Sequence, residues 1–279
     1  MGELGVKTLV QHLEKQPVER RISTGETLVT PENMNTPDIK PLVFAPKADN
    51  VSGSLSGAKS RKWRVMIIPK ETTQEFWMTI HAGALKAEKE LGNVEVVWQG
   101  PARENDRVQQ IQFVQSAVAA GVDRIVLAPL DARALALPVE TAVAKGIPVV
   151  VIDSGLESTK PVSYISTDNY HGGVLAAQRM GKLLGGEERV ILLRYAVGSE
   201  STEQREKGFT DTLSKEFPRI TLLTESEYTG ATSDQAQQKS QSLVTRYRGQ
   251  CDGVFCPNET STVGMMRALE EAGLLAGRH

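Results

Sequence analysis

Aromatic, acidic, basic and amide side chains stand where predicted strands end or predicted helices begin, and they define the chemistry open to this chain. The set comprises Gln74, Phe76, Trp77, Asp153, Ser154, Arg205, Tyr228 and Asn258. Aromatic faces pack against C–H surfaces, while carboxylate, guanidinium and amide groups form directed hydrogen bonds, often in pairs. These residue types together favour reversible binding of a small polar molecule over bond-breaking chemistry.

A catalytic or metal-binding set is not visible in the sequence. Ser199 and Ser201 have no histidine in a recognisable motif, as a serine nucleophile would require. Residues 198–202 lack the Gly-Lys-Ser/Thr ending of a phosphate loop. The four histidines are scattered, without companion cysteines or carboxylates at metal-ligand spacing. We therefore expect no catalytic residues, no metal, no cofactor and no enzymatic activity.

The candidates from Gln74 to Asp153 also have structural explanations that do not involve a ligand. Either Phe76 or Trp77 could be an ordinary core residue, and Gln74 could be a solvated loop residue. Asp153 ends an apolar run, where a helix N-cap is the alternative to ligand binding. Gly155 and the loop beyond it argue against an immediate helix, so we favour a ligand role for Asp153, assisted by Ser154.

The later candidates carry similar alternatives. Arg205 lies near a helix start, where its charge opposes the helix dipole, so a ligand or a salt bridge must hold it. Asn258 precedes a helix and could be its N-cap. Tyr228 lies just beyond a strand and could either contact a ligand or have a structural role. Asp131 also ends a strand, but we interpret it as a cap or loop anchor.

Composition sets broad limits on the class of protein. With 279 residues the chain can form two domains, and its net charge of −2 gives no reason to expect nucleic acid or an anionic membrane as a partner. No stretch reaches membrane-span length, and Met1 opens onto an amphipathic helix with no visible signal peptide. Cys251 and Cys256 flank a strand that would hold their Cα atoms roughly 15 Å apart, too far for a disulfide.

The organisation is an alternation of apolar strands and amphipathic helices. Strands are predicted at 65–69, 94–99, 124–129, 148–153, 162–166, 189–194, 220–226 and 253–257. Helices are predicted at 76–91, 105–120, 135–145, 173–184, 204–216, 234–247 and 260–272. Near-continuous apolar runs are typical of parallel strands covered on both faces. The pattern predicts an α/β fold with two doubly wound parallel-sheet lobes and a ligand cleft between them.

The pattern restarts after Asp168 and Asn169, which places a lobe boundary there. We assign 63–167 plus 1–22 to one lobe and 168–279 plus 23–46 to a second, incomplete lobe. The Ser- and Gly-rich segment 47–62 is predicted to be an exposed linker. A helix at 2–15 should pack on the first lobe.

Motifs along residues 63–277 resemble periplasmic sugar-binding proteins of the ribose-binding type. They are Phe76-Trp77 with Gly83-Ala84, and the segments 126–131, 146–154, 167–173, 205–209 and 253–264. The resemblance implies that a monosaccharide or related polyol binds between two hinged lobes. It also implies that Phe76 and Trp77 stack on the sugar, with Arg205 binding hydroxyls and Gln74 in the same site. The partner would be a transporter permease or chemoreceptor, in the periplasm or another extracytoplasmic space.

The order of the segments departs from that family. Residues 1–46 resemble its closing stretch, so the sequence resembles a circular permutant whose old termini are joined through the linker. A strand–helix–strand segment of roughly 30 residues is then absent at the cut. Its absence would leave the strand at 253–256 as an open sheet edge, prone to self-association. Alternatives are an engineered permuted or split scaffold with weak or no binding, and a LacI-type regulatory effector domain.

Overall fold

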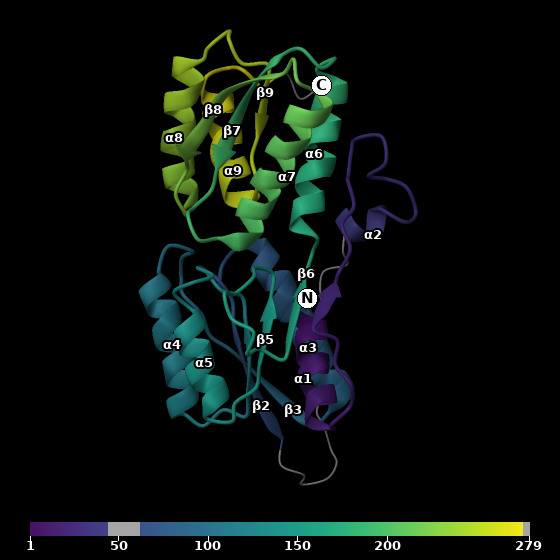
Figure 1. Cartoon of the computed structure of the whole chain (residues 1–279), viewed down its shortest axis with the longest axis vertical. Coiled ribbons are helices and arrows are strands. Elements are labelled where there is room, and N and C mark those ends of the chain that lie inside the picture. Colours follow the sequence, from purple (N-terminus) through teal and green to yellow (C-terminus); the bar gives the residue numbers. More distant parts are fainter. Residues whose placement is uncertain (44–61, 276–279) are drawn as a thin grey trace.

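Two α/β lobes stacked end to end form the molecule in the computed structural model, which describes residues 1–43 and 62–275 (Figure 1). One lobe is built on a six-stranded sheet and the other on a three-stranded sheet. Every strand pairing in both sheets is parallel. The predicted doubly wound α/β fold is confirmed.

The larger sheet has the order β1-β6-β5-β4-β2-β3. Its strands are β1 (Arg21–Ser23), β2 (Trp63–Ile68), β3 (Val94–Trp98), β4 (Arg124–Leu127), β5 (Val149–Ile152) and β6 (Ser163–Ser166). Helices α1 (Gly2–Leu13) and α3 (Glu75–Leu91) cover one face, and α4 (Arg107–Ala119) and α5 (Ala136–Ala144) the other (Figure 1). Because the sheet is covered on both sides, β5 is buried along its whole length.

The smaller sheet has the order β8-β7-β9. Its strands are β7 (Arg189–Arg194), β8 (Thr221–Tyr228) and β9 (Gly253–Phe255). Helices α6 (Asn169–Leu183) and α7 (Glu200–Glu216) share one hydrophobic cluster with the sheet, and α8 (Ser233–Arg246) and α9 (Glu259–Glu271) share another. Gly173 lets α6 approach α7 closely, because a Cβ there would collide with the backbone of Arg205.

All eight strands and seven helices predicted after residue 62 are present, with shifted ends. Two helices begin four residues earlier than predicted. α6 begins at Asn169 and not at Gly173, because the Asp168 side chain accepts a hydrogen bond from His171 N and caps the helix. α7 begins at Glu200 and not at Gln204, so the polar run after Gly198 is helical, not a loop.

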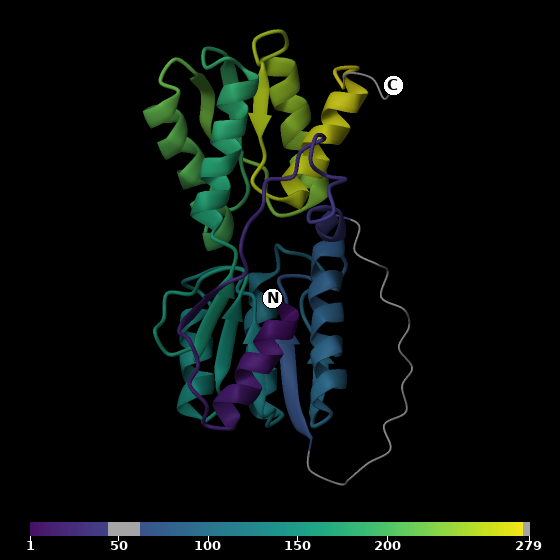
Figure 2. The same cartoon turned by 90° about the vertical axis from the view of Figure 1, so that its right-hand side faces the viewer.

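The opening segment joins both lobes. α1 buries Val6, Leu9 and Val10 against α3 and the larger sheet, and β1 pairs with β6. Beyond Ser23 the chain runs beside α6, where Glu26 contacts His171 and Glu32 pairs with Arg179, and it reaches the short helix α2 (Lys40–Val43). Figure 2 shows this crossing between the lobes.

The lobe and linker boundaries predicted from the sequence are only partly covered by the described residues and remain predictions. Ser23, assigned to the second lobe, still belongs to the six-stranded sheet. The predicted linker lies outside the described residues, apart from Lys62. Within the described ranges, none of the helices is long and apolar enough to cross a membrane.

Candidate functional site

A small cavity of about 110 Å³ lies between the lobes and is lined by residues of both. Six of the eight predicted site residues line it: Gln74, Phe76, Trp77, Asp153, Arg205 and Asn258. Gln74, Phe76 and Trp77 follow β2, Asp153 follows β5, Asn258 follows β9, and Arg205 lies near the start of α7. These positions bring the six side chains to the same cavity. In open α/β sheets, ligands bind at these carboxyl ends of the strands.

A buried ion pair forms one wall of the cavity. Lys70 Nζ lies 3.0 Å from Asp153 Oδ2 and donates a hydrogen bond to Ser201 Oγ at 3.2 Å. Asp153 has a φ of 65°, an uncommon conformation for a residue other than glycine. No helix follows it, so the N-cap alternative is wrong.

Trp77 and Tyr195 share a buried carboxylate. Trp77 Nε1 donates a hydrogen bond to Glu104 Oε1 at 2.8 Å, and the Tyr195 hydroxyl donates to the other carboxylate oxygen. Burial raises the pKa of the Glu104 carboxyl, against the opposing charge of Lys70. Trp77 is 2% exposed, so it belongs to the core as well as to the cavity wall. Phe76 packs edge-on against it, with ring centroids 4.9 Å apart.

Arg205 is held by neutral acceptors. Its Nε donates to Asn169 Oδ1 at 2.9 Å and its Nη1 to the carbonyl of Pro257 at 2.8 Å. No carboxylate lies within ion-pair distance of Arg205 in the part of the chain that is described, so the salt-bridge alternative is wrong. Arg205 thus lies at the cavity without an ion-pair partner among the described residues.

Asn258 and Gln74 have structural partners as well as cavity positions. Asn258 is the N-cap of α9, accepting from Ser261 N at 3.1 Å, so the capping alternative is correct for its amide oxygen. Gln74 donates to Thr260 Oγ1 at 3.0 Å, across the lobe boundary. It is therefore not a solvated loop residue.

The structure places two predicted residues outside the cavity lining. Ser154 is fully buried beneath it and accepts from Ser201 N at 3.0 Å, which joins the lobes. Tyr228 is half exposed at the end of β8 and accepts from Arg194 Nη1 at 3.2 Å. β8 is an edge strand of the smaller sheet, and Tyr228 at its end does not line the cavity.

Sequence reasoning missed several cavity residues: Lys70, Glu104, Tyr195, Ser199, Ser201, Thr202 and Glu259. Lys70 and Tyr195 closely follow the ends of β2 and β7, so the strand-end rule could have found them. Glu104 lies in a loop with no motif, and nothing local marks it. Ser199, Ser201 and Thr202 lie in a segment that carries neither a serine–histidine motif nor a complete phosphate loop, so no motif marks them as ligand residues.

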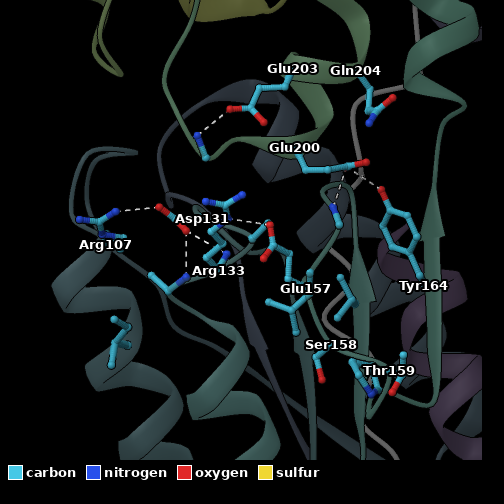
Figure 3. Close-up of a pocket in the computed structure, with 18 of the residues that line it drawn as sticks. Arg107, Asp131, Arg133, Glu157, Ser158, Thr159, Tyr164, Glu200, Glu203 and Gln204 are labelled. Atoms are coloured by element: carbon cyan, nitrogen blue, oxygen red, sulfur yellow. Dashed lines mark hydrogen bonds and ion pairs between the residues drawn. The ribbon is translucent and has the colours of Figure 1, made fainter. Parts of the chain in front are cut away.

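A larger, open groove of about 1300 Å³ lies beside the lobe junction (Figure 3). Its acidic groups are engaged within the protein. Asp131 accepts from Arg133 N at 2.9 Å and Ala134 N at 2.8 Å and pairs with Arg107, which confirms its role as a loop anchor. Glu200 accepts from Gly155 N at 2.8 Å and from the Tyr164 hydroxyl at 3.2 Å. The smaller cavity, with its aromatic pair and with Arg205 held by neutral acceptors, is the better candidate for a small polar ligand.

A family model for the periplasmic binding protein domain matches residues 65–279. The chain belongs to this family. The resemblance predicted from the cavity motifs is confirmed, whereas the permuted order of residues 1–46 lies outside the match and remains a prediction. In this periplasmic binding protein, no group of three or more His, Cys, Asp or Glu side chains in the described ranges could hold a metal.

Solved periplasmic binding proteins share the fold. A solute-binding protein from Agrobacterium radiobacter in complex with D-arabinose is 32% identical with a TM-score of 0.72, over 76% of this chain and 72% of that one. One from Agrobacterium vitis with bound D-fucose is 30% identical with a TM-score of 0.72, over 76% and 73%.

Curated relatives point to the same class. A xylitol-binding protein of Mycolicibacterium smegmatis is 30% identical over 65% of this chain and 51% of its own length. The ribose import binding protein of Bacillus subtilis is 26% identical over 71% and 62%. The chain thus spans about half to three-fifths of the relatives that it matches here.

Proposed function

We propose that this chain binds a monosaccharide or related polyol in the cavity between its lobes. The observation that carries the proposal is the convergence of an aromatic pair, a buried ion pair and an arginine held by neutral acceptors on one small cavity. Phe76 and Trp77 offer apolar faces to the C–H surface of a sugar. Arg205 and the Lys70–Asp153 pair offer charge-assisted hydrogen bonds to its hydroxyls.

The size of the cavity supports a compact ligand. At about 110 Å³ it is smaller than the 300–1,000 Å³ typical of pockets for drug-sized molecules. A pentose, a short polyol or a small deoxyhexose fits a cavity of this size better than an oligosaccharide does. The names of the relatives, which bind xylitol, D-arabinose and D-fucose, support the same range.

The ligand would favour the arrangement in which the lobes touch, because it contacts both at once. Direct contacts such as Gln74 to Thr260 and Ser154 to Ser201 already join the lobes around the cavity. In this proposal the sugar-loaded form is recognised by an ABC-transporter permease or a chemoreceptor, outside the cytoplasm. The role is binding for uptake or sensing, with no chemical step.

A calorimetric screen tests the proposal. The purified chain is titrated with xylitol, D-ribose, D-arabinose and D-fucose, with sucrose as a ligand too large for the cavity. At least one of the four should bind, and at 100 times its dissociation constant it should add about 2.7 kcal/mol to the free energy of unfolding. A folded chain that binds none of them would overturn the proposal.

A further inference from the structure

Glu104 is a buried carboxyl at the boundary between the lobes. It lies in the loop between β3 and α4 and lines the interlobe cavity. One carboxylate oxygen accepts from Trp77 Nε1 at 2.8 Å, within the lobe of the larger sheet. The other oxygen accepts from the hydroxyl of Tyr195, which follows β7 in the opposite lobe. Glu104 and Tyr195 are 9% and 2% exposed, so this contact between the lobes is kept out of water.

The charged groups of the cavity do not neutralise Glu104. Lys70 is already paired with Asp153, at 3.0 Å. Across residues 1–43 and 62–275, no lysine, arginine or histidine nitrogen lies within ion-pair distance of Glu104. Arg205 donates its hydrogen bonds to neutral acceptors, and Glu259 adds a further carboxyl to the lining. Two carboxyls thus share one ammonium on this wall of the cavity.

The protonation of Glu104 therefore depends on whether the lobes touch. Burial raises the pKa of its carboxyl, against the lowering effects of Lys70 and of the hydrogen bonds from Tyr195 and Trp77. In water a glutamate carboxyl has a pKa near 4.5. Separated lobes would expose Glu104 and return its pKa toward that value. Above pH 4.5, and up to the raised pKa, the closed form therefore binds more protons than the open form, so acid favours closure.

We propose that closure of the lobes takes up a proton at Glu104, so that the chain binds its ligand more tightly as the solution becomes more acidic. The link to a sugar rests on the proposed function, whereas the link to closure rests on the contact with Tyr195. The proton comes from solvent and returns to solvent when the lobes separate. A protonated Glu104 keeps both neighbours, because it can donate to the Tyr195 oxygen and still accept from Trp77 Nε1.

Calorimetry with the best sugar of the screen tests the link to binding. Titrations at pH 6 in phosphate and in imidazole buffer, whose ionisation enthalpies differ, give the number of protons taken up with the sugar. Wild type should show net uptake, and its affinity should rise by about threefold or more between pH 7.5 and pH 5.5, since one full proton is worth about tenfold per pH unit. Glu104→Gln, whose amide mimics the protonated carboxyl, should lose the uptake and the dependence of affinity on pH.

Two further variants test the assignment to Glu104. Tyr195→Phe removes a hydrogen bond that lowers the pKa of Glu104, so the change of affinity with pH should move to higher pH. Glu206→Gln is the matched control, because Glu206 is a buried carboxyl whose pKa is raised to about 7 by burial, yet its polar contacts with Tyr195 N and Arg194 lie within its own lobe. It should keep the proton uptake. Uptake that survives in Glu104→Gln and disappears in Glu259→Gln overturns the inference.

Small-angle scattering of the sugar-free chain separates this inference from the proposed function. The radius of gyration of wild type should decrease from pH 7.5 to pH 5.5, and that of folded Glu104→Gln should stay constant. Sugar binding without proton uptake, or a wild type whose scattering does not change with pH, overturns the inference and leaves the proposed function standing. If no sugar binds but wild type and Glu104→Gln differ in scattering as expected, the proposed function fails and proton-coupled closure is supported.

Discussion

Lys70 Nζ lies 3.0 Å from Asp153 Oδ2, and the two side chains are only 5% and 6% exposed. The pair joins the end of β2 to the end of β5 beside the interlobe cavity. Both charges have been removed from water, so each depends on the other. The pair therefore links the stability of the larger lobe to the chemistry of the candidate site.

Removing one partner of this pair should be costly. Lys70→Met leaves the Asp153 carboxylate buried and uncompensated, and the free energy of unfolding should fall by about 3–5 kcal/mol. Urea unfolding followed by circular dichroism measures the change. The double variant Lys70→Met with Asp153→Asn should recover part of the loss. If the single variant is as stable as the wild type, the pair is not a coupled unit.

Arg205 should contribute to ligand affinity. Arg205→Met removes a charge-assisted hydrogen bond to a sugar hydroxyl, worth about 1.5–3 kcal/mol, so binding should weaken roughly 10- to 100-fold. Calorimetry with the best sugar of the screen provides the measurement. Arg219→Met, which removes an exposed surface ion pair with Glu187, is the matched control and should bind normally. Unchanged affinity in Arg205→Met would exclude this arginine from the site.

Glu206 should make stability depend on pH. Burial raises the pKa of its carboxyl to about 7, while the unfolded carboxyl titrates near 4.5. Between these values the folded state holds a proton that the unfolded state releases, so stability falls as pH rises from about 4.5 to 7 and levels off above. The contribution is on the order of 3 kcal/mol.

Glu206→Gln isolates that contribution, because the amide still accepts the hydrogen bond from Tyr195 N. Urea unfolding at pH 5 and pH 7.5 should show a smaller loss of stability in the variant than in the wild type. Parallel pH profiles for the two proteins would mean that Glu206 is ionised in the folded state throughout.

Glu200 should stabilise contact between the lobes. Its carboxylate, on α7, accepts hydrogen bonds from Gly155 N and the Tyr164 hydroxyl in the other lobe (Figure 3). Glu200→Ala should shift the population toward separated lobes. Sugar binding should then weaken about five- to tenfold, although Glu200 does not line the cavity. Small-angle scattering should show a larger radius of gyration in the sugar-free variant. Identical scattering and affinity would contradict this role. Glu216→Ala, at the far end of the same helix, serves as control.

The sequence by itself determined the elements and most of the strand ends. Apolar runs specified the parallel strands, and Gly92, Gly121 and Gly146 ended three helices in the left-handed conformation that glycine tolerates. Because parallel strands present their carboxyl ends at one edge, the chain positions of Asp153 and Asn258 were enough to predict that both reach the cavity.

Only the tertiary structure decided how those side chains are paired. Glu104, in the loop before α4, meets Trp77 on α3 and Tyr195 after β7. Lys70, after β2, meets Asp153, after β5, across the intervening strand β4. Tyr228 ends a strand much as Asp153 follows one, yet β8 is an edge strand and Tyr228 does not line the cavity. Local sequence governs backbone conformation and periodicity, whereas burial and partner choice depend on which segments fold against one another.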